Sequence, residues 1–241
     1  MTFAGVNVYF CRTPARSKGA AERNDFSRME DLLRFVEDQK IIAVIRVSDH
    51  SDAECIAKAV IDGGIRVIEI TPHVSQSTKL VETLAKQSDV VVGLGSATDG
   101  EQAYRAIQVG ARFVSSLYLD NSILTVCKNN NAMVMQGAST VTEAIEAYHF
   151  GVDLVRLFPA DFLGGAPYVK CLRRSFPFLK VVPTSGVTLD NFLDYIRAGA
   201  TACAVGRGFY DASMVRGHLW SEITDRAKQF AERLESLKVT R

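Results

Sequence analysis

Short apolar runs alternate with helical segments along most of this chain, and this alternation limits the fold more than any other feature. Eight such runs can be recognised, four without a preceding glycine, beginning near positions 40, 90, 132 and 180. The other four follow a glycine closely, and these glycines lie 46, 41 and 48 residues apart, at Gly64, Gly110, Gly151 and Gly199. A repeat of this kind predicts eight strands that alternate with eight helices.

The runs and the segments between them give boundaries for each expected element. Strands are predicted at residues 40–46, 65–71, 90–95, 112–116, 132–136, 154–158, 180–184 and 201–205. A first helix is predicted to follow a cap at Ser27, and a second to begin at Ser51 and end at position 61. Apolar residues at helical spacing predict the remaining helices at 75–86, 100–109, 122–128, 142–150, 167–175, 189–198 and 219–237.

The predicted strands are apolar on both faces, which is typical of a parallel sheet covered by helices. We therefore expect an α/β fold, a single (β/α)8 TIM barrel with an extra N-terminal helix. A doubly wound open sheet needs the same alternation and is the alternative fold. No G-x-G-x-x-G motif follows the first strand, which argues against a dinucleotide-binding sheet.

The chain divides into an N-terminal segment and one large domain. Of its 241 residues, 47% are apolar, which is enough for a sizeable core, and we expect the barrel to occupy residues 26–241. Residues 1–25 carry several basic residues and few acids, a balance that resembles a transit peptide. No amphipathic helix is evident there, however, and we expect residues 1–25 to be a flexible leader.

Charge and cysteine content exclude several classes of protein. The formal net charge is +1, so the chain lacks the basic surface of a nucleic-acid-binding protein, and no apolar run approaches the ~18 residues of a membrane span. The five cysteines are odd in number and without C-x-x-C spacing, which favours reduced thiols in the cytoplasm. The four histidines are scattered, so we expect neither a metal site nor a cofactor.

One arginine stands in an apolar strand. Arg156 lies in the run Leu154-Val155-Arg156-Leu157-Phe158, which Pro159 ends. A guanidinium is always charged, and burying it without partners would be very unfavourable. We therefore expect either that Arg156 points into a polar cavity or that this run is not a strand.

The active site of a barrel of this kind lies at the carboxyl ends of its strands. Glu69 and Arg156 are the ionisable residues there that are embedded in apolar strands, and they could either bind a ligand or pair with each other. Arg46 is a second cation at the same rim. The other polar candidates at strand ends are Thr71, His73, Ser96, Ser115, Ser116 and Gln136.

The loops after the last two strands contain glycines and polar residues. They read Thr184-Ser185-Gly186 and Gly206-Arg207-Gly208. Barrels often bind phosphate at these loops, through backbone N–H groups that glycine exposes, and Arg207 would add a charge-assisted contact. The alternative is that the glycines only permit tight turns.

Several motifs, taken together and in this order, resemble the pyruvate-dependent aldolases that cleave 2-keto-3-deoxy-6-phosphogluconate and 4-hydroxy-2-oxoglutarate. The resemblance covers about residues 28–237. It implies a homotrimeric class I aldolase that acts on a small 2-keto acid or sugar-acid phosphate, with Glu69 as general acid/base. The motifs are Ala43-Val44-Ile45-Arg46, Gly63-Gly64-Ile65-Arg66-Val67-Ile68-Glu69-Ile70-Thr71, Val92-Gly93-Leu94-Gly95-Ser96, Gly137-Ala138-Ser139-Thr140, Phe158-Pro159-Ala160 and Pro183-Thr184-Ser185-Gly186.

The chain departs from the family at the position of the nucleophile. In the family a lysine two residues before Phe-Pro-Ala forms a Schiff base with the substrate ketone, and Arg156 stands there. Arg46, Glu69 and Phe158 are retained by resemblance. The other departures are His73 in place of an arginine, Ser96 in place of a threonine, Ser115-Ser116 in place of Ser-Pro and Gly208 in place of a serine.

A guanidinium cannot lose its proton to attack a ketone, so Arg156 makes covalent Schiff-base chemistry doubtful. Three hypotheses follow. The chain is an aldolase-type lyase in which Arg156 stabilises an enolate electrostatically, an isomerase-type enzyme that uses Glu69 as base, or a pseudoenzyme that binds a sugar-acid phosphate without turnover.

Overall fold

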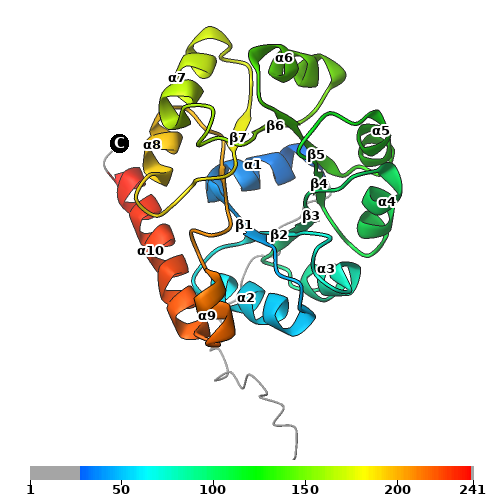
Figure 1. The fold of residues 1–241 in the computed structure, drawn as a ribbon. Coiled ribbons are helices and arrows are strands. Elements are labelled where there is room, and N and C mark those ends of the chain that lie inside the picture. Colours follow the sequence, from blue (N-terminus) through cyan, green and yellow to red (C-terminus); the bar gives the residue numbers. More distant parts are fainter. Residues whose placement is uncertain (1–27, 240–241) are drawn as a thin grey trace, which may run out of the picture.

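A computed structural model describes residues 28–239 as a ring of eight parallel strands with helices around it (Figure 1). Each strand pairs with the next in sequence from β1 to β7, and β1 also pairs with β8. A single bridge between Thr184 and Ala204 joins β7 to β8. The strands are β1 (Ile41–Ile45), β2 (Val67–Ile70), β3 (Val91–Leu94), β4 (Phe113–Ser115), β5 (Met133–Ala138), β6 (Leu154–Leu157), β7 (Val181–Pro183) and β8 (Cys203–Val205). The predicted (β/α)8 barrel is confirmed.

A helix follows each strand, as the repeat predicts. These helices are α2 (His50–Asp62), α3 (Ser77–Ala85), α4 (Gly100–Gln108), α5 (Asn121–Asn129), α6 (Val141–Phe150), α7 (Gly165–Ser175), α8 (Phe192–Arg197) and, after β8, α9 (Ala212–Arg216) and α10 (Trp220–Val239). The short helix α9 was not predicted. No helix in the described part of the chain combines the length and the apolarity needed to cross a membrane.

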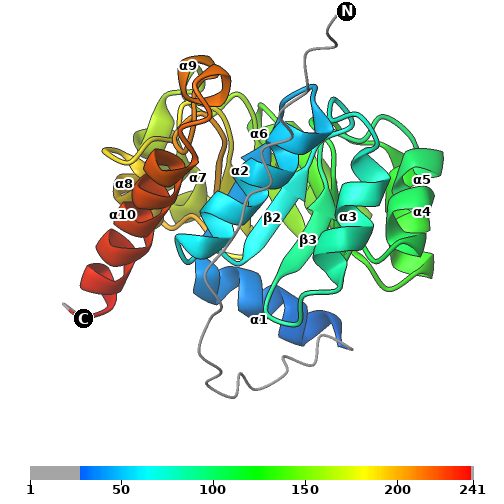
Figure 2. The same cartoon turned by 90° about the horizontal axis from the view of Figure 1, so that it is seen from below.

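The extra N-terminal helix, α1 (Met29–Gln39), lies across the amino-terminal end of the barrel, opposite α9 (Figure 2). Its buried Leu32 and Val36 pack with side chains of the barrel interior. A residue in the left-handed conformation, Lys40 with φ 60°, then turns the chain into β1. The amino-terminal end is therefore closed by an apolar plug, and the carboxyl end is left for a site.

Two of the expected helix caps differ from the structure. Asp49, rather than Ser51, is the N-cap of α2, and its carboxylate accepts a hydrogen bond from the N–H of Asp52. The N-cap of α1 is Arg28, while the expected cap Ser27 lies outside the described residues, as does the leader expected at residues 1–25. Aspartate and serine are about equally good caps, so the sequence could not decide between positions 49 and 51.

The side chains of the strands divide between two apolar clusters. One cluster fills the space between strands and helices, and the other lies inside the ring with α1. In β6, Leu154 points inward and Val155 and Leu157 point outward, so strand alternation turns Arg156 into the barrel. The same alternation turns Glu69 and Ser115 inward from β2 and β4, beyond the apolar layer.

Helix α6 begins with a reciprocal cap. The Thr140 hydroxyl accepts a hydrogen bond from the N–H of Glu143 (3.2 Å), and the Glu143 carboxylate accepts bonds from the N–H groups of Ser139 and Thr140 (both 2.8 Å). These backbone bonds, first that of Ser139, hold the pKa of the Glu143 carboxyl below its ordinary value. The cap fixes the start of the helix directly after the end of β5.

We expect Thr140→Ala to lower the free energy of unfolding by about 1 kcal/mol, because it removes the side-chain half of this cap. The matched control is Thr83→Ala in α3, where the hydroxyl bonds only to the carbonyl of Lys79 within the same helix. Alanine is the better helix former there, so stability should hold or rise slightly. Urea denaturation of both variants measures the difference, and equal losses would contradict the role of the cap.

Candidate active site

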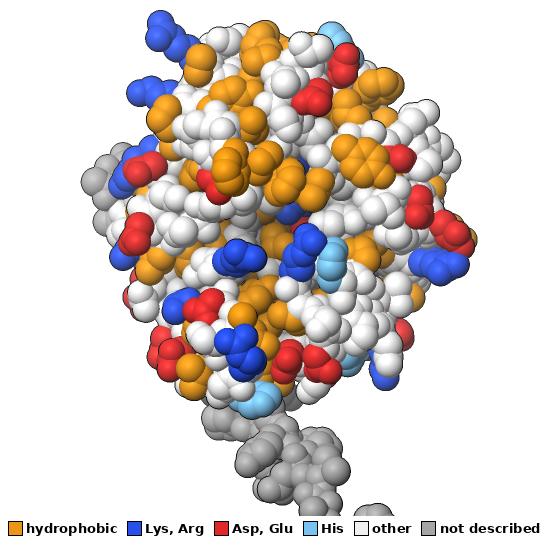
Figure 3. Space-filling view, in the orientation of Figure 1, with side chains coloured by type: hydrophobic (Ala, Val, Ile, Leu, Met, Phe, Trp, Pro, Cys, Tyr) orange, Lys and Arg blue, Asp and Glu red, His pale blue; other side chains and the backbone are white. Residues whose placement is uncertain are grey.

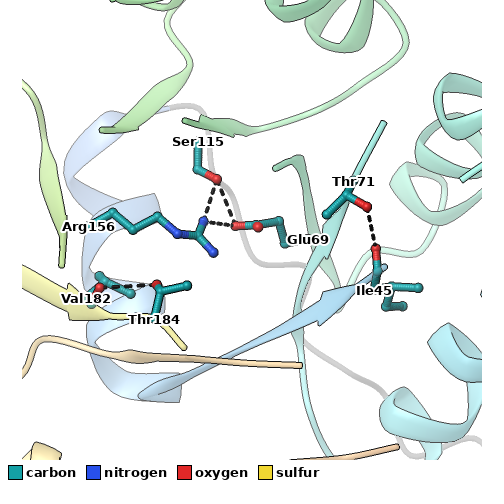
Figure 4. Close-up of polar contacts among 7 residues, drawn as sticks. All are labelled: Ile45, Glu69, Thr71, Ser115, Arg156, Val182 and Thr184. Atoms are coloured by element: carbon teal, nitrogen blue, oxygen red, sulfur yellow. Dashed lines mark hydrogen bonds and ion pairs between the residues drawn. The ribbon is translucent and has the colours of Figure 1, made fainter. Parts of the chain in front are cut away.

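Three polar side chains meet inside the barrel. Arg156 Nη1 donates hydrogen bonds to Glu69 Oε2 and to Ser115 Oγ, both at 2.5 Å, and Ser115 Oγ donates to Glu69 Oε2 at 3.0 Å (Figure 4). The three residues come from β6, β2 and β4, and none is more than 1% exposed. Arg156 thus has the buried partner that its place in an apolar strand required.

The far side of the Glu69 carboxylate lies against the backbone of Gly95. A Cβ atom at position 95 would stand 2.0 Å from Glu69 Oε1, so only glycine fits there. Glu69 Oε1 is buried and accepts no hydrogen bond from any described residue. The carboxylate is therefore held between the guanidinium on one side and the backbone of the next strand on the other.

One edge of the Arg156 guanidinium is left open. Nη1 is used by Glu69 and Ser115, whereas Nη2 makes no hydrogen bond to another described residue, and Figure 4 shows it directed away from both partners. Arg156 also lines a cavity at the carboxyl end of the barrel. A fixed guanidinium with a free N–H edge can donate hydrogen bonds to a carboxylate or an enolate oxygen.

The cavity has a volume of about 460 Å3 and brings together most of the residues expected at the site. On the face of Figure 3, Lys or Arg side chains and a histidine gather around a central hollow. The predicted residues that line the cavity are Arg46, Thr71, Ser96, Arg156, Phe158, Thr184, Ser185, Gly186, Gly206, Arg207 and Gly208.

Five predicted residues do not line this cavity, and one of them, Ser115, is bonded to Arg156 Nη1 inside the barrel. Glu69 lies behind Arg156, and His73 lies at the rim, where its Nε2 contacts Arg46 Nη2 at 2.9 Å. The Ser116 hydroxyl donates to the carbonyl of Tyr118, and the Gln136 amide bonds to the backbone of Asp120. Ser116 and Gln136 therefore hold the loop between β4 and α5.

Six lining residues were not predicted as site residues: Val44, Leu117, Asp161, Val187, Thr188 and Ala204. Asp161 follows Phe-Pro-Ala directly after β6, so its position next to a predicted motif was a usable signal. Its side chain packs on Gly186, where an added Cβ would stand 2.3 Å from Asp161 Cβ. Gly186 also has a positive φ of 66°. Glycine at 186 is thus required both by the backbone and by its neighbour.

The two loops predicted to bind phosphate both line the cavity. Gly208 is closely packed, since an added Cβ would stand 2.6 Å from Val205 Cγ1. The hydroxyl of Tyr210 accepts a hydrogen bond from the N–H of Arg46 (2.7 Å) and donates to the carbonyl of Val44 (3.2 Å). Burial raises the pKa of Tyr210, so it remains a hydroxyl that ties the end of β1 to the loop after β8.

A sequence model described as KDPG and KHG aldolase matches residues 33–226, which is most of the chain. The chain belongs to this aldolase family. Among similar curated proteins, the 2-dehydro-3-deoxy-phosphogluconate aldolase of Treponema pallidum (strain Nichols) is 28% identical over 202 residues, covering 83% of this chain and 96% of the relative. The KHG/KDPG aldolase of Escherichia coli (strain K12) is 26% identical over 193 residues, with coverage of 80% and 91%.

Solved structures agree with this family. A KDPG aldolase from Legionella pneumophila, crystallised with pyruvate captured as a covalent carbinolamine intermediate, matches with a TM-score of 0.73 and 27% identity, covering 80% of this chain and 95% of that one. A carbinolamine is the adduct of an amine and a carbonyl group. No lysine is among the described residues that line the cavity of this family member.

The buried ion pair can be tested by a double-mutant cycle. We expect Arg156→Met to lower the free energy of unfolding by about 3–5 kcal/mol, because it leaves Glu69 charged and buried without a partner. Adding Glu69→Gln should recover most of this loss. The control cycle removes the ion pair of Lys180 and Glu37, whose side chains are 42% and 35% exposed, and should give a coupling of at most about 1 kcal/mol. Similar coupling in both cycles, measured by denaturant unfolding, would contradict the assignment.

Proposed function

We propose that this chain is a carbon–carbon lyase acting on a small 2-keto acid, and that Arg156 stands where the family's lysine forms its Schiff base. The observation that carries the proposal is the open N–H edge of Arg156 in the cavity, held from behind by Glu69 and Ser115. This arrangement offers a fixed cation to an oxygen that becomes negative.

The chemistry differs from that of an amine nucleophile. A guanidinium stays protonated at neutral pH and forms no iminium. Cleavage of the bond between C3 and C4 of a 4-hydroxy-2-keto acid leaves the electron pair as an enolate on the C2 oxygen. Hydrogen bonds from Arg156 would stabilise that charge in the transition state, in the way an oxyanion hole does.

The remaining lining residues are assigned to the two ends of the substrate. Arg46, Thr71, Ser96 and Phe158 would contact the 2-keto acid, with His73 orienting Arg46. The loops Thr184–Gly186 and Gly206–Gly208 would bind a phosphate, as in a substrate of the 2-keto-3-deoxy-6-phosphogluconate type. With a substrate of the 4-hydroxy-2-oxoglutarate type, a second carboxylate would lie there, and Arg207 suits either anion.

A borohydride trap with pyruvate tests the role of Arg156. We expect the wild type to remain unmodified by mass spectrometry, because none of the described residues that line the cavity carries an amine, and Arg156→Lys to gain a stable reduced adduct. The control is Lys180→Arg, which removes a lysine at the amino-terminal end of β7 and should leave the wild-type result unchanged. A stable adduct on the wild type would overturn the non-covalent mechanism.

Turnover separates the three functions in the same samples. Pyruvate released from a 4-hydroxy-2-keto acid without a trapped adduct is the result expected here. Binding of the substrate without release would favour a pseudoenzyme, and interconversion of sugar phosphates without pyruvate would favour an isomerase.

The chain is also proposed to form a homotrimer. Three apolar side chains are exposed near the carboxyl ends of β4–β6: Tyr118 (46%), Val141 (42%) and Phe162 (85%). A partner subunit seated over this rim would cover them. One fold neighbour, 23% identical with a TM-score of 0.75, is a cage designed by fusing symmetric oligomeric domains.

We expect Phe162→Asp to convert the trimer into smaller species, since it would place a charge in the contact. The control is Phe150→Asp at the end of α6, where the side chain is 58% exposed and away from the carboxyl rim. Light scattering after size exclusion measures both masses. A wild type that is monomeric, or a trimer that survives Phe162→Asp and not Phe150→Asp, would contradict the proposed contact.

The proposed location is the cytoplasm. Cys127, Cys171 and Cys203 are free thiols. Burial raises the pKa of Cys127 to about 12, so this thiol is chemically inert inside the protein. Free thiols of this kind suit a reducing compartment.

A further inference from the structure

Cleavage of a 4-hydroxy-2-keto acid needs a group that takes the proton of the C4 hydroxyl. Glu69 is poorly placed for this role in the present chain. Its side chain is 0% exposed, Oε2 is bonded to Arg156 and Ser115, and Oε1 lies against Gly95. Arg156 therefore stands between this carboxylate and any ligand in the cavity.

The cavity offers one alternative. Among the described side chains that line it, Asp161 is the one carboxylate, and no histidine lies among them. The other polar side chains are hydroxyls and guanidinium groups, which do not accept a proton near neutral pH. Asp161 is therefore the residue of the described cavity that can act as the base.

The fold brings Asp161 to the cavity from the end of β6. The N–H of Phe158 donates to the carbonyl of Ala138 (3.2 Å), and the N–H of Ala160 donates to that of Thr184 (2.8 Å). These bonds hold the segment after β6 beside its neighbouring strands on both sides of Pro159. Asp161 therefore lies over the loop after β7, against Gly186. No hydrogen bond or ion pair to another described side chain engages the Asp161 carboxylate, so its oxygens are available to a ligand.

We propose that Asp161, rather than Glu69, is the catalytic acid/base of the lyase. The carboxylate removes the proton from the C4 hydroxyl, the C4–O bond becomes a carbonyl, and the C3–C4 bond breaks. Its electron pair forms the C2–C3 double bond and displaces the C2 carbonyl pair onto oxygen, where Arg156 donates hydrogen bonds. Protonated Asp161 then returns the proton to C3, which gives pyruvate and restores the carboxylate.

This assignment rests on the proposed function and gives Glu69 a different task. Glu69 and Ser115 act as positioning residues, because they hold Nη1 of Arg156 and so aim Nη2 at the cavity. Asp161 supplies the only proton movement the reaction needs, and the proton it takes from oxygen is the proton it gives to carbon. No cofactor or second substrate enters the balance.

Exchange of the methyl protons of pyruvate for deuterium in D2O tests the assignment without knowledge of the aldehyde. This exchange is the enolisation half of the reaction, and proton NMR follows it directly. We expect the wild type to catalyse it and Asp161→Asn to reduce kcat for exchange at least about 100-fold, the usual contribution of a positioned base. Asp161→Glu should recover part of the loss, and formate should restore some exchange to Asp161→Asn by acting as a diffusible base.

The control is Asp62→Asn, which neutralises an exposed carboxylate near the end of α2 and should leave exchange unchanged. A merely electrostatic role for Asp161 would alter KM for pyruvate, whereas the loss of a base lowers kcat. Asp161→Asn with kcat within about threefold of wild type would overturn the assignment and leave the proposed function standing. A wild type that exchanges no faster than buffer would overturn both.

Discussion

A charged pair inside the barrel governs the rest of this structure. Arg156 and Glu69 are both removed from solvent, and each is tolerable there because the other is present. Their pairing fixes the guanidinium at one edge and leaves the opposite edge for the cavity. The pairing also keeps the Glu69 carboxylate out of the cavity. The same bond therefore positions Arg156 to bind a ligand and prevents Glu69 from acting on that ligand as a base.

Much of the barrel could be predicted from the sequence, because the glycine spacing and the apolar runs are local signals. The pairing of Arg156 with Glu69 could not be decided in this way. The two residues are 87 positions apart, and their meeting depends on the register of every strand between β2 and β6. What the sequence did establish is that an arginine in an apolar strand needs either a partner or a cavity, and it has both.

The prediction of the candidate site was less accurate than that of the fold: it included residues that do not line the cavity and missed others that do. Strands that are apolar on both faces do not reveal which residues point inward. Gln136 was predicted at the site because it lies near a strand end. Its neighbour Met135 points into the barrel, so Gln136 points outward, and its side chain bonds to the backbone of Asp120. Asp161 was missed because it lies beyond the strand, where only the path of the loop brings it over Gly186.

The ring itself is least complete beside the cavity. All other neighbouring strands share a ladder, but β7 and β8 are joined by the bridge of Thr184 to Ala204 alone. The loops after these two strands both line the cavity. An anion bound by both loops would bridge β7 and β8, and its binding energy would add to the stability of the folded barrel. The bound ligand would then add contacts between β7 and β8, where the backbone contributes a single bridge.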